Sequence, residues 1–323
     1  MSVGERLPVD SAQASIFAML DESTWARWRD RKLQMHPRRA ADLVVEVRDP
    51  RNLSSPEHAA LLERLRRANM AIYASAVGDD DAEIPRRIGA RLGLRTLDAN
   101  LLAEDDGVTR ITADAAKASA GFIPYTAGRM LWHTDGYYNA PAMRVRSMLL
   151  HCVRPAAQGG ETALLDPEIA WLLLREADTR FIRALMDPEA LTIPERRDED
   201  GIARPAIGGP VFSIDPATGD LHTRFTARRR SVRWKCDATV SEAAARLLAI
   251  LDGDTPYVLR TRLEAGMGLV CNNVLHARST FSDAPGAPRL LFRARFVERI
   301  AGTEGAWADL ARAPSGPQGR TYT

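Results

Sequence analysis

The segment Leu131-Trp132-His133-Thr134-Asp135-Gly136 carries more chemical information than any other short stretch of the chain. In an extended segment, residues i and i+2 project to the same side, so His133 and Asp135 can bind one metal ion from one face. A distant His276 could complete a set of two histidines and one carboxylate. On an iron ion, such a set leaves three positions open for a bidentate cosubstrate and oxygen. Taken alone, a His-x-Asp pair is more often a polar turn than a metal site.

The residues that follow His276 strengthen the metal interpretation. In the strand expected over 290–298, Arg289 and Arg293 lie on one face, because side chains alternate along a strand. If that face lines a barrel interior, each buried guanidinium needs an anionic partner, and a carboxylate fits its planar fork. The alternative is that both arginines face solvent or pair with an acidic neighbour such as Glu298.

The rest of the chain predicts helices first and many short strands later. This order, with one helical insertion, indicates a β-barrel or sandwich core wrapped by helices. Helices are expected over 11–34, 55–74, 83–94, 167–175, 179–186 and 241–251. Strands are expected over 145–153, 161–165, 257–263, 268–272 and 290–298, with a hairpin over 211–226.

The composition excludes several classes of protein. The chain has 323 residues, 45% of them hydrophobic, which is enough to bury a core without disulfides. With 44 basic and 42 acidic residues, its charge gives little long-range attraction to nucleic acid. No apolar run approaches the roughly 20 residues of a membrane-spanning helix. Three scattered cysteines argue against a disulfide framework, so we expect a cytoplasmic protein without nucleic-acid or membrane partners.

The order of these motifs resembles the TauD/TfdA family of iron(II)- and 2-oxoglutarate-dependent dioxygenases. The likeness covers roughly residues 120–300 and combines the His-x-Asp pair, the segment Gly-Gly-Glu-Thr-Ala-Leu over 159–164, and a distal histidine followed by arginine. It implies a mainly β fold with flanking helices around a double-stranded β-helix, or jelly roll. The chain then divides into an N-terminal helical elaboration over 1–110, a jelly-roll dioxygenase core with a helical insertion over 111–302, and a flexible tail over 303–323.

The resemblance also implies roles for single residues. The iron ligands would be His133, Asp135 and His276. Arg289 falls where the family binds the distal carboxylate of 2-oxoglutarate, and Thr162 falls where a threonine assists that arginine. The implied cofactors are Fe²⁺, 2-oxoglutarate and O₂, with ascorbate as an aid in vitro. No catalytic residue beyond the iron centre is expected.

The residues that bind the substrate are expected next to these motifs. Arg293 matches a position that contacts an anionic substrate in taurine-type members, and residues beside the His-x-Asp turn usually face the substrate in this family. The further candidates are Trp132, Tyr137, Tyr138, Asn139 and Arg224. For Trp132 and Tyr138, the alternative is a place in the hydrophobic core.

These observations predict a dioxygenase that hydroxylates a C–H bond of a small anionic or zwitterionic metabolite and releases succinate and CO₂. Two alternatives stay open. The segment 210–230 resembles the γ-butyrobetaine and trimethyllysine hydroxylase branch, which points to a betaine-type quaternary amine, although its arginines would repel a cation. The other alternative is a non-catalytic jelly roll that binds a small acid. A homodimer is also left open.

Overall fold

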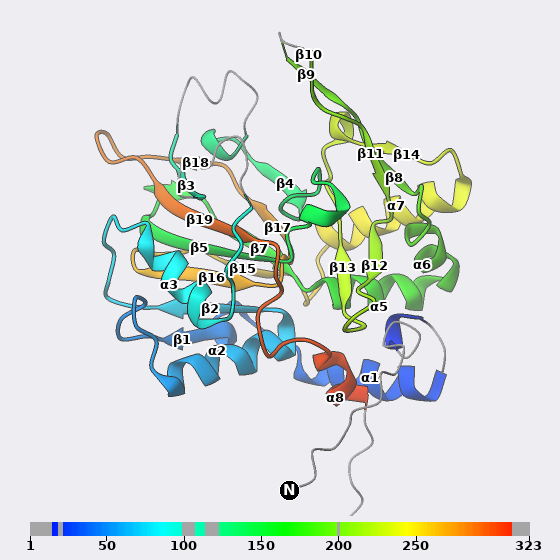
Figure 1. Cartoon of the computed structure of the whole chain (residues 1–323), viewed down its shortest axis with the longest axis horizontal. Coiled ribbons are helices and arrows are strands. Elements are labelled where there is room, and N and C mark those ends of the chain that lie inside the picture. Colours follow the sequence, from blue (N-terminus) through cyan, green and yellow to red (C-terminus); the bar gives the residue numbers. More distant parts are fainter. Residues whose placement is uncertain (1–14, 19–21, 99–106, 114–122, 199–200, 312–323) are drawn as a thin grey trace, which may run out of the picture.

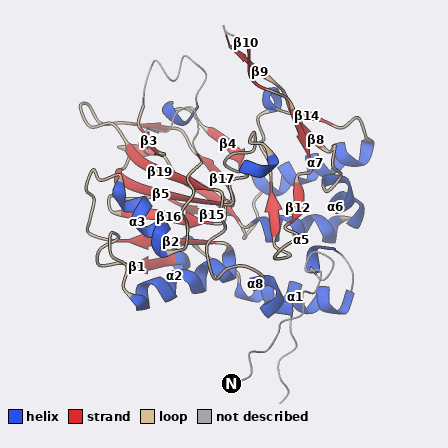
Figure 2. Cartoon of the chain, in the orientation of Figure 1, coloured by secondary structure: helices blue, strands red, loops and turns tan. Residues whose placement is uncertain are grey.

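The computed structural model describes residues 15–18, 22–98, 107–113, 123–198 and 201–311 of the chain. Two β-sheets form its centre, and helices lie against them (Figure 1; Figure 2). This arrangement confirms the expectation of a mainly β core with flanking helices. None of the helices in these ranges combines the length and the apolar character that a membrane crossing requires.

The larger sheet has six strands in the order β1-β2-β16-β5-β19-β3. β1 and β2 run parallel, and every other neighbouring pair is antiparallel. The strands are β1 (Val44–Glu46), β2 (Met70–Ala74), β3 (Val108–Ile111), β5 (Ser147–Arg154), β16 (Met267–Cys271) and β19 (Leu290–Phe296).

The smaller sheet has four antiparallel strands in the order β15-β7-β17-β4. The strands are β4 (Met130–His133), β7 (Thr162–Leu165), β15 (Leu259–Thr261) and β17 (Leu275–Arg278). Leu164 and Leu259 of this sheet share one hydrophobic cluster with Leu269 and Leu291 of the larger sheet. The two sheets therefore pack on each other through their inner faces, while the double-stranded β-helix itself stays a prediction.

The helices form two groups on the outer faces of the sheets. α1 (Glu22–Met35), α5 (Pro167–Ala177), α6 (Thr179–Leu185) and α7 (Ala238–Asp252) form one apolar cluster with Leu275 and Ala277 of the smaller sheet. α2 (Ser55–Ala68) and α3 (Glu83–Arg91) form another with Val270 and Phe292 of the larger sheet. Both predicted helices between 167 and 186 and the one near 241–251 are thus confirmed.

Shorter elements connect this framework. The hairpin expected over 211–226 is present as β12 (Phe212–Ile214) and β13 (Leu221–Thr223), which pair in antiparallel fashion. The other short strands are β6 (Gln158–Gly159), β8 (Leu191–Ile193), β9 (Arg196–Asp198), β10 (Gly201–Arg204), β11 (Ile207–Gly209), β14 (Arg233–Trp234) and β18 (Phe281–Ser282). The 3₁₀ helices are η1 (Ile16–Ala18), η2 (Ala40–Leu43), η3 (Ile123–Tyr125), η4 (Pro141–Met143) and η5 (Arg229–Ser231).

The helix expected over 55–74 is shorter than its sequence pattern predicts. It begins with a capping box, in which Ser54 Oγ accepts from the Glu57 amide and the Glu57 carboxylate accepts from the Ser54 amide at 2.7 Å. It ends at Ala68, because Asn69 adopts a left-handed conformation with φ 57. The apolar residues that follow form β2, so the segment predicted as a helical elaboration also supplies strands to the larger sheet.

Two predictions at the chain ends fall partly outside the described residues. Within the helix expected over 11–34, the structure has η1 and α1, and residues 11–14 and 19–21 lie outside the described ranges. In the tail expected to be flexible, residues 306–311 form α8 (Ala306–Ala311), and 312–323 lie outside. The division into three parts stays a prediction.

β19 presents two chemically different faces. Phe292, Ala294 and Phe296 point to the cluster under α2 and α3. Leu291 belongs to the cluster between the sheets, and alternation places Arg289 and Arg293 on this same inner face. Both arginines are buried, so the arginine-bearing face of this strand lies inside the molecule.

Candidate metal centre

The structure brings His133, Asp135 and His276 to one point. His133 ends β4, and its register partner on β17 is His276, so the two imidazole ring centroids lie 4.2 Å apart. Asp135 lies two residues beyond His133. The ligand atoms of all three residues lie within 4.8 Å of one another, and all three residues are buried. The sequence therefore selected three side chains that the fold places together from two different strands.

Both histidines are oriented by backbone carbonyls. His133 Nδ1 lies 2.9 Å from Leu131 O, and His276 Nδ1 lies 2.9 Å from Val274 O. Because a carbonyl oxygen only accepts, Nδ1 carries the proton in each ring and Nε2 is left with its lone pair. Burial lowers the pKa of His133 to about 3 and also lowers the pKa of His276. Neutral imidazoles with free Nε2 atoms are the form that binds a metal ion.

Asp135 has one carboxylate oxygen in use and one without a partner. Its Oδ1 accepts from Arg293 Nη1 at 3.2 Å. Its Oδ2 is buried and has no hydrogen-bond partner among the described residues. Burial by itself raises the pKa of Asp135, but Arg293 and Arg295 outweigh burial and hold that pKa below its usual value. An ionised, buried oxygen without a partner, next to two free imidazole nitrogens, fits a divalent cation.

Asn273 holds the turn that carries Asp135. Its Oδ1 accepts from the Asp135 amide at 2.8 Å, and its Nδ2 donates to the Asp135 carbonyl at 2.9 Å and to the Val145 carbonyl at 2.7 Å. Asn273 itself is left-handed, with φ 48. Sequence reasoning did not single out Asn273, although the pair Asn272-Asn273 between two apolar strands is a turn signal.

Arg289 is a buried arginine in surroundings that would stabilise a bound carboxylate. It is 8% exposed, and no carboxylate of the described residues lies within ion-pair distance of its guanidinium. Burial lowers its pKa. A Cβ built on Gly160, two residues before Thr162, would lie 3.7 Å from Arg289 Nε. The fold therefore brings the segment with Thr162 next to this arginine and leaves the guanidinium without an anion.

Arg278 is a second buried arginine beside Arg289, and sequence reasoning missed it. It is the register partner of Thr162 and donates to the carbonyls of Thr126 at 2.7 Å and Gly128 at 2.6 Å. Its guanidinium lies 4.7 Å from the Phe281 ring centroid, and that of Arg289 lies 5.2 Å from the same centroid. Burial and the charge of Arg289 lower the pKa of Arg278 to about 10. Its only sequence signal was its place two residues after His276.

The predicted substrate residues beside the turn lie in different surroundings. Tyr138 accepts from Arg295 Nη1 at 3.0 Å, and Tyr137 packs edge-on against it with ring centroids 5.1 Å apart. Asn139 donates to Asp98 at 2.9 Å, which fixes the loop rather than leaving the amide free. Of the two tyrosines beside the turn, only Tyr137 has a hydroxyl with no hydrogen bond to the described residues.

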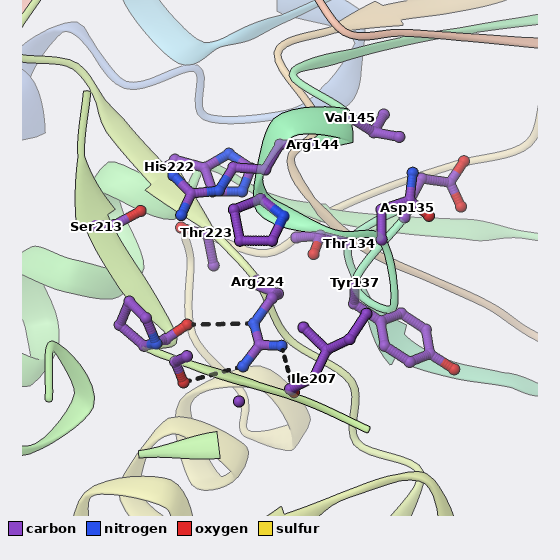
Figure 3. Close-up of a pocket in the computed structure, with 16 residues that line it drawn as sticks. Thr134, Asp135, Tyr137, Arg144, Val145, Ile207, Ser213, His222, Thr223 and Arg224 are labelled. Atoms are coloured by element: carbon purple, nitrogen blue, oxygen red, sulfur yellow. Dashed lines mark hydrogen bonds between the residues drawn. The ribbon is translucent and has the colours of Figure 1, made fainter. Parts of the chain in front are cut away.

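Two predicted substrate residues do not reach the metal cluster. Trp132 is buried in the cluster beneath the helices, because it lies on the opposite face of β4 from His133. Arg224 turns its guanidinium to backbone carbonyls and donates to Ile207 at 3.2 Å and to Gly209 at 2.9 Å (Figure 3). It also donates to the Leu191 carbonyl. For Trp132 the structure therefore matches the core alternative, and Arg224 stabilises the loops around it.

Thr226 lies directly beside His133, a placement that sequence reasoning missed. The segment 225–227 runs antiparallel to β4, with Thr134 N donating to Phe225 O at 3.0 Å and Ala227 N donating to Trp132 O at 2.8 Å. In such a pair the opposed side chains of Thr226 and His133 point to the same face and lie close. Arg228 follows in extended conformation, so alternation places it on that face too.

The fold and the site together define a class. Two packed sheets under helices, with two histidines and an aspartate gathered at one point and a buried arginine that has no acidic partner among the described residues, fit an iron- and 2-oxoglutarate-dependent oxygenase. The chain belongs to the TauD/TfdA family: the family model "Taurine catabolism dioxygenase TauD, TfdA family" matches residues 30–295. It is thus an oxygenase that uses Fe(II), 2-oxoglutarate and O₂.

Two curated relatives carry the same name. A uridine-5'-phosphate dioxygenase of an Amycolatopsis species is 37% identical over 178 residues, which cover 54% of this chain and 62% of the relative. The alignment thus spans less than two thirds of that relative's length. A uridine-5'-phosphate dioxygenase of a Streptomyces species is 32% identical over 203 residues, covering 60% of this chain and 71% of the relative.

Solved structures share the fold at low identity. An asparagine oxygenase in complex with Fe(II), 3-hydroxyasparagine and succinate matches with a TM-score of 0.53 and 16% identity, covering 86% of this chain and 92% of that one. The non-heme iron oxygenase OrfP with Fe and α-ketoglutaric acid matches with a TM-score of 0.53, 16% identity and the same coverage, 86% and 92%.

Proposed function

We propose that this chain oxidises a C–H bond of a small phosphorylated metabolite of the nucleoside 5'-phosphate class and releases succinate and CO₂ from 2-oxoglutarate. The observation that carries the proposal is the buried cluster of His133, Asp135 and His276 inside a fold that also buries Arg289 without an acid. When bound, iron and 2-oxoglutarate supply the activation of O₂.

The chain's own residues would bind and orient these groups. Nε2 of both histidines and the free Oδ2 of Asp135 would hold the metal. Arg289 would take the distal carboxylate of 2-oxoglutarate as a bidentate pair, with the Thr162 hydroxyl beside it. Arg278 would add positive charge on the same side of the cluster. An intact carboxylate at position 135 favours hydroxylation over halogenation, because a halide needs the position that this ligand fills.

Charge near the cluster favours an anionic substrate. Arg293 contacts Asp135, and Arg228 lies on the face of its segment that carries Thr226 next to His133. The guanidinium of Arg228 has no hydrogen bond or ion pair with the described residues. These cations disfavour a quaternary amine, and the names of both curated relatives point to a uridine phosphate. We also infer that the two packed sheets form the double-stranded β-helix expected of this family.

The test is succinate formation from 2-oxoglutarate with Fe(II), ascorbate and O₂, with uridine-5'-phosphate and uridine as parallel substrates. We expect the phosphate ester to raise the rate of succinate release at least about tenfold above the rate without substrate, and more than uridine does. His133→Ala should abolish release, while Arg183→Gln, an exposed position on α6, should keep it. If no nucleoside 5'-phosphate raises release by the wild-type chain, the proposed substrate class is wrong.

A further inference from the structure

A polar cavity lies behind the His-x-Asp turn. It encloses about 430 Å³, including its open mouth, and is lined in part by Thr134, Gly136 and Arg144. Asp135 is also among the lining residues, so the cavity borders the turn that carries this member of the metal cluster, and in Figure 3 the carboxylate of Asp135 points away from Arg224. A second cavity of about 460 Å³ shares His222 and Thr223 with the first. Neither cavity has a role in the mechanism above.

Four arginines line the two cavities, and three of them form hydrogen bonds or ion pairs with other groups of the chain. Arg224 is bound by backbone carbonyls. Arg146 donates to the Val297 carbonyl at 3.1 Å and pairs with Asp215 at 3.4 Å. Arg299 donates to Asn69 at 2.7 Å and pairs with Asp220 at 3.5 Å.

Arg144 is the fourth arginine, and its donors are unused. Its guanidinium has no hydrogen bond and no ion pair with any residue that the structure describes. The side chain is only partly exposed, and it lies near His222 at one end of the cavity in Figure 3. A guanidinium offers five N–H donors in a planar fork, which matches the oxygens of a phosphate.

His222 lies on the face of β13 that borders the cavity. Its register partner on β12 is Ser213, which also lines the cavity, whereas Thr223 pairs with Phe212 of the hydrophobic cluster and points to the opposite face. The imidazole of His222 has no hydrogen bond with any residue that the structure describes. This imidazole is an observation independent of the arginine.

The electrostatic surroundings favour an anion. Burial, followed by the charges of Arg144 and Arg146, lowers the pKa of His222 to about 3. Burial and then Arg146 lower the pKa of Arg144. Asp215 and Asp220 offset part of this charge but are already paired with Arg146 and Arg299. The cavity is therefore positive, and its imidazole is neutral and free to form a hydrogen bond.

We propose that this cavity is a phosphate-binding site in which Arg144 contacts the phosphate oxygens and His222 adds a hydrogen bond. The location follows from the cavity, while the identity of the anion rests on the proposed function. A phosphate ester and free inorganic phosphate present the same tetrahedral oxygens, so both are candidate sources. Because Thr134 and Gly136 form one wall, an occupied site braces the turn that carries Asp135.

The test is direct calorimetric binding to the full-length, iron-loaded chain with 2-oxoglutarate and without O₂, so that no turnover occurs. The ligands are inorganic phosphate, uridine-5'-phosphate and uridine. The variants are Arg144→Gln, His222→Phe and the matched control Arg183→Gln. We expect both site variants to weaken phosphate-dependent binding about tenfold or more and the control to leave it unchanged.

The ligands separate the two sources of phosphate. Weaker binding of uridine-5'-phosphate with unchanged binding of uridine assigns the site to the phosphate of the ester. Weaker binding of inorganic phosphate alone assigns it to the free anion. Unchanged affinities in both site variants, or a wild-type chain that binds neither inorganic phosphate nor uridine-5'-phosphate, would overturn the proposal. Because binding is measured without turnover, failure of the succinate assay and failure of this site are distinguishable.

Discussion

Arg289 is a buried residue whose guanidinium has no carboxylate of the described residues within ion-pair distance. Its neighbours are Arg278, which is itself cationic, and Phe281, which contributes only a ring face. An anion that joined these two buried cations would offset the free-energy cost of burying them. At the scale of a single residue, Arg289 is therefore the side chain that indicates an anionic ligand most clearly.

Replacing Arg289 by Gln should raise the KM for 2-oxoglutarate about 10- to 100-fold, because a charge-assisted bidentate pair is lost. Iron binding should change little, since Arg289 is not among the three clustered ligand residues. The measurement is the rate of succinate formation as a function of 2-oxoglutarate concentration, with Arg183→Gln as control. An unchanged KM would show that the cosubstrate carboxylate binds elsewhere.

Some residues of the site could be predicted from the sequence and others could not. His133, Asp135 and Arg289 were singled out by local spacing and alternation, whereas distant His276 and the roles of all four residues followed from the resemblance to the TauD/TfdA family. Arg278, Thr226 and Asn273 were missed, since their importance comes from contacts with distant strands that no local pattern encodes. For Trp132, which was left open between a substrate contact and a core residue, the structure matches the core alternative, because adjacent residues of β4 face opposite sides.

At the scale of elements, the metal cluster depends on a contact between two turns, the one after β4 and the one between β16 and β17. β16 and β17 are joined by a turn whose Asn273 forms two hydrogen bonds with Asp135 in the turn after β4 and a third with the Val145 carbonyl, and these three bonds form a clamp. The two histidines then come into register because β4 and β17 pair directly. The clamp connects strands that lie far apart in the sequence.

Asn273→Ala should weaken iron binding about tenfold or more and destabilise the fold, because it removes the clamp and strains a left-handed backbone. Asn273→Gly keeps the backbone relaxed and removes only the clamp. We expect both variants to lose iron affinity and the glycine variant to retain more stability, measured by metal titration and urea unfolding. Wild-type iron affinity in Asn273→Gly would contradict the positioning role.

The same scale explains why some elements were predicted incorrectly. The run Met70–Ala74 is uniformly apolar, and such a run fits a buried helix turn or a buried strand equally well. The left-handed Asn69 decides for the strand. β17 was not predicted because it is four residues long and carries two polar side chains into the interior.

At the scale of the whole molecule, a buried ion network joins the helices to the core. Lys32 of α1 is 0% exposed, and its Nζ lies 2.6 Å from Asp166 and 2.6 Å from Glu168. It also donates to the Arg67 carbonyl at the end of α2, at 3.0 Å. Asp166 in turn accepts from Asn69, which ties the network to the start of β2.

Lys32→Met should lower the free energy of unfolding by about 3–5 kcal/mol, because two buried carboxylates lose their cation. The matched control is Arg39→Met, whose side chain is 79% exposed and whose ion pair should contribute little. Urea unfolding measures both. A loss below about 1 kcal/mol for Lys32→Met would show that the network does not stabilise the fold.

Stability should also fall as the pH falls, partly through His36. Burial, followed by the charge of Lys32, lowers the pKa of His36 from 6.5 to about 4. Between these two values the unfolded chain binds a proton that the folded chain does not, so unfolding becomes easier as pH falls. Between about pH 7 and pH 5 this term contributes about 2 kcal/mol. His36→Leu should show a correspondingly smaller loss of unfolding free energy over that interval, and an equal loss would refute the assignment.

The most direct test of the central claim is a crystal structure of the chain grown without O₂ in the presence of Fe(II) and 2-oxoglutarate. We predict an anomalous iron peak bound by His133, Asp135 and His276, with the distal carboxylate of 2-oxoglutarate on Arg289. An iron peak away from these three side chains, or a cosubstrate carboxylate that does not contact Arg289, would contradict the account.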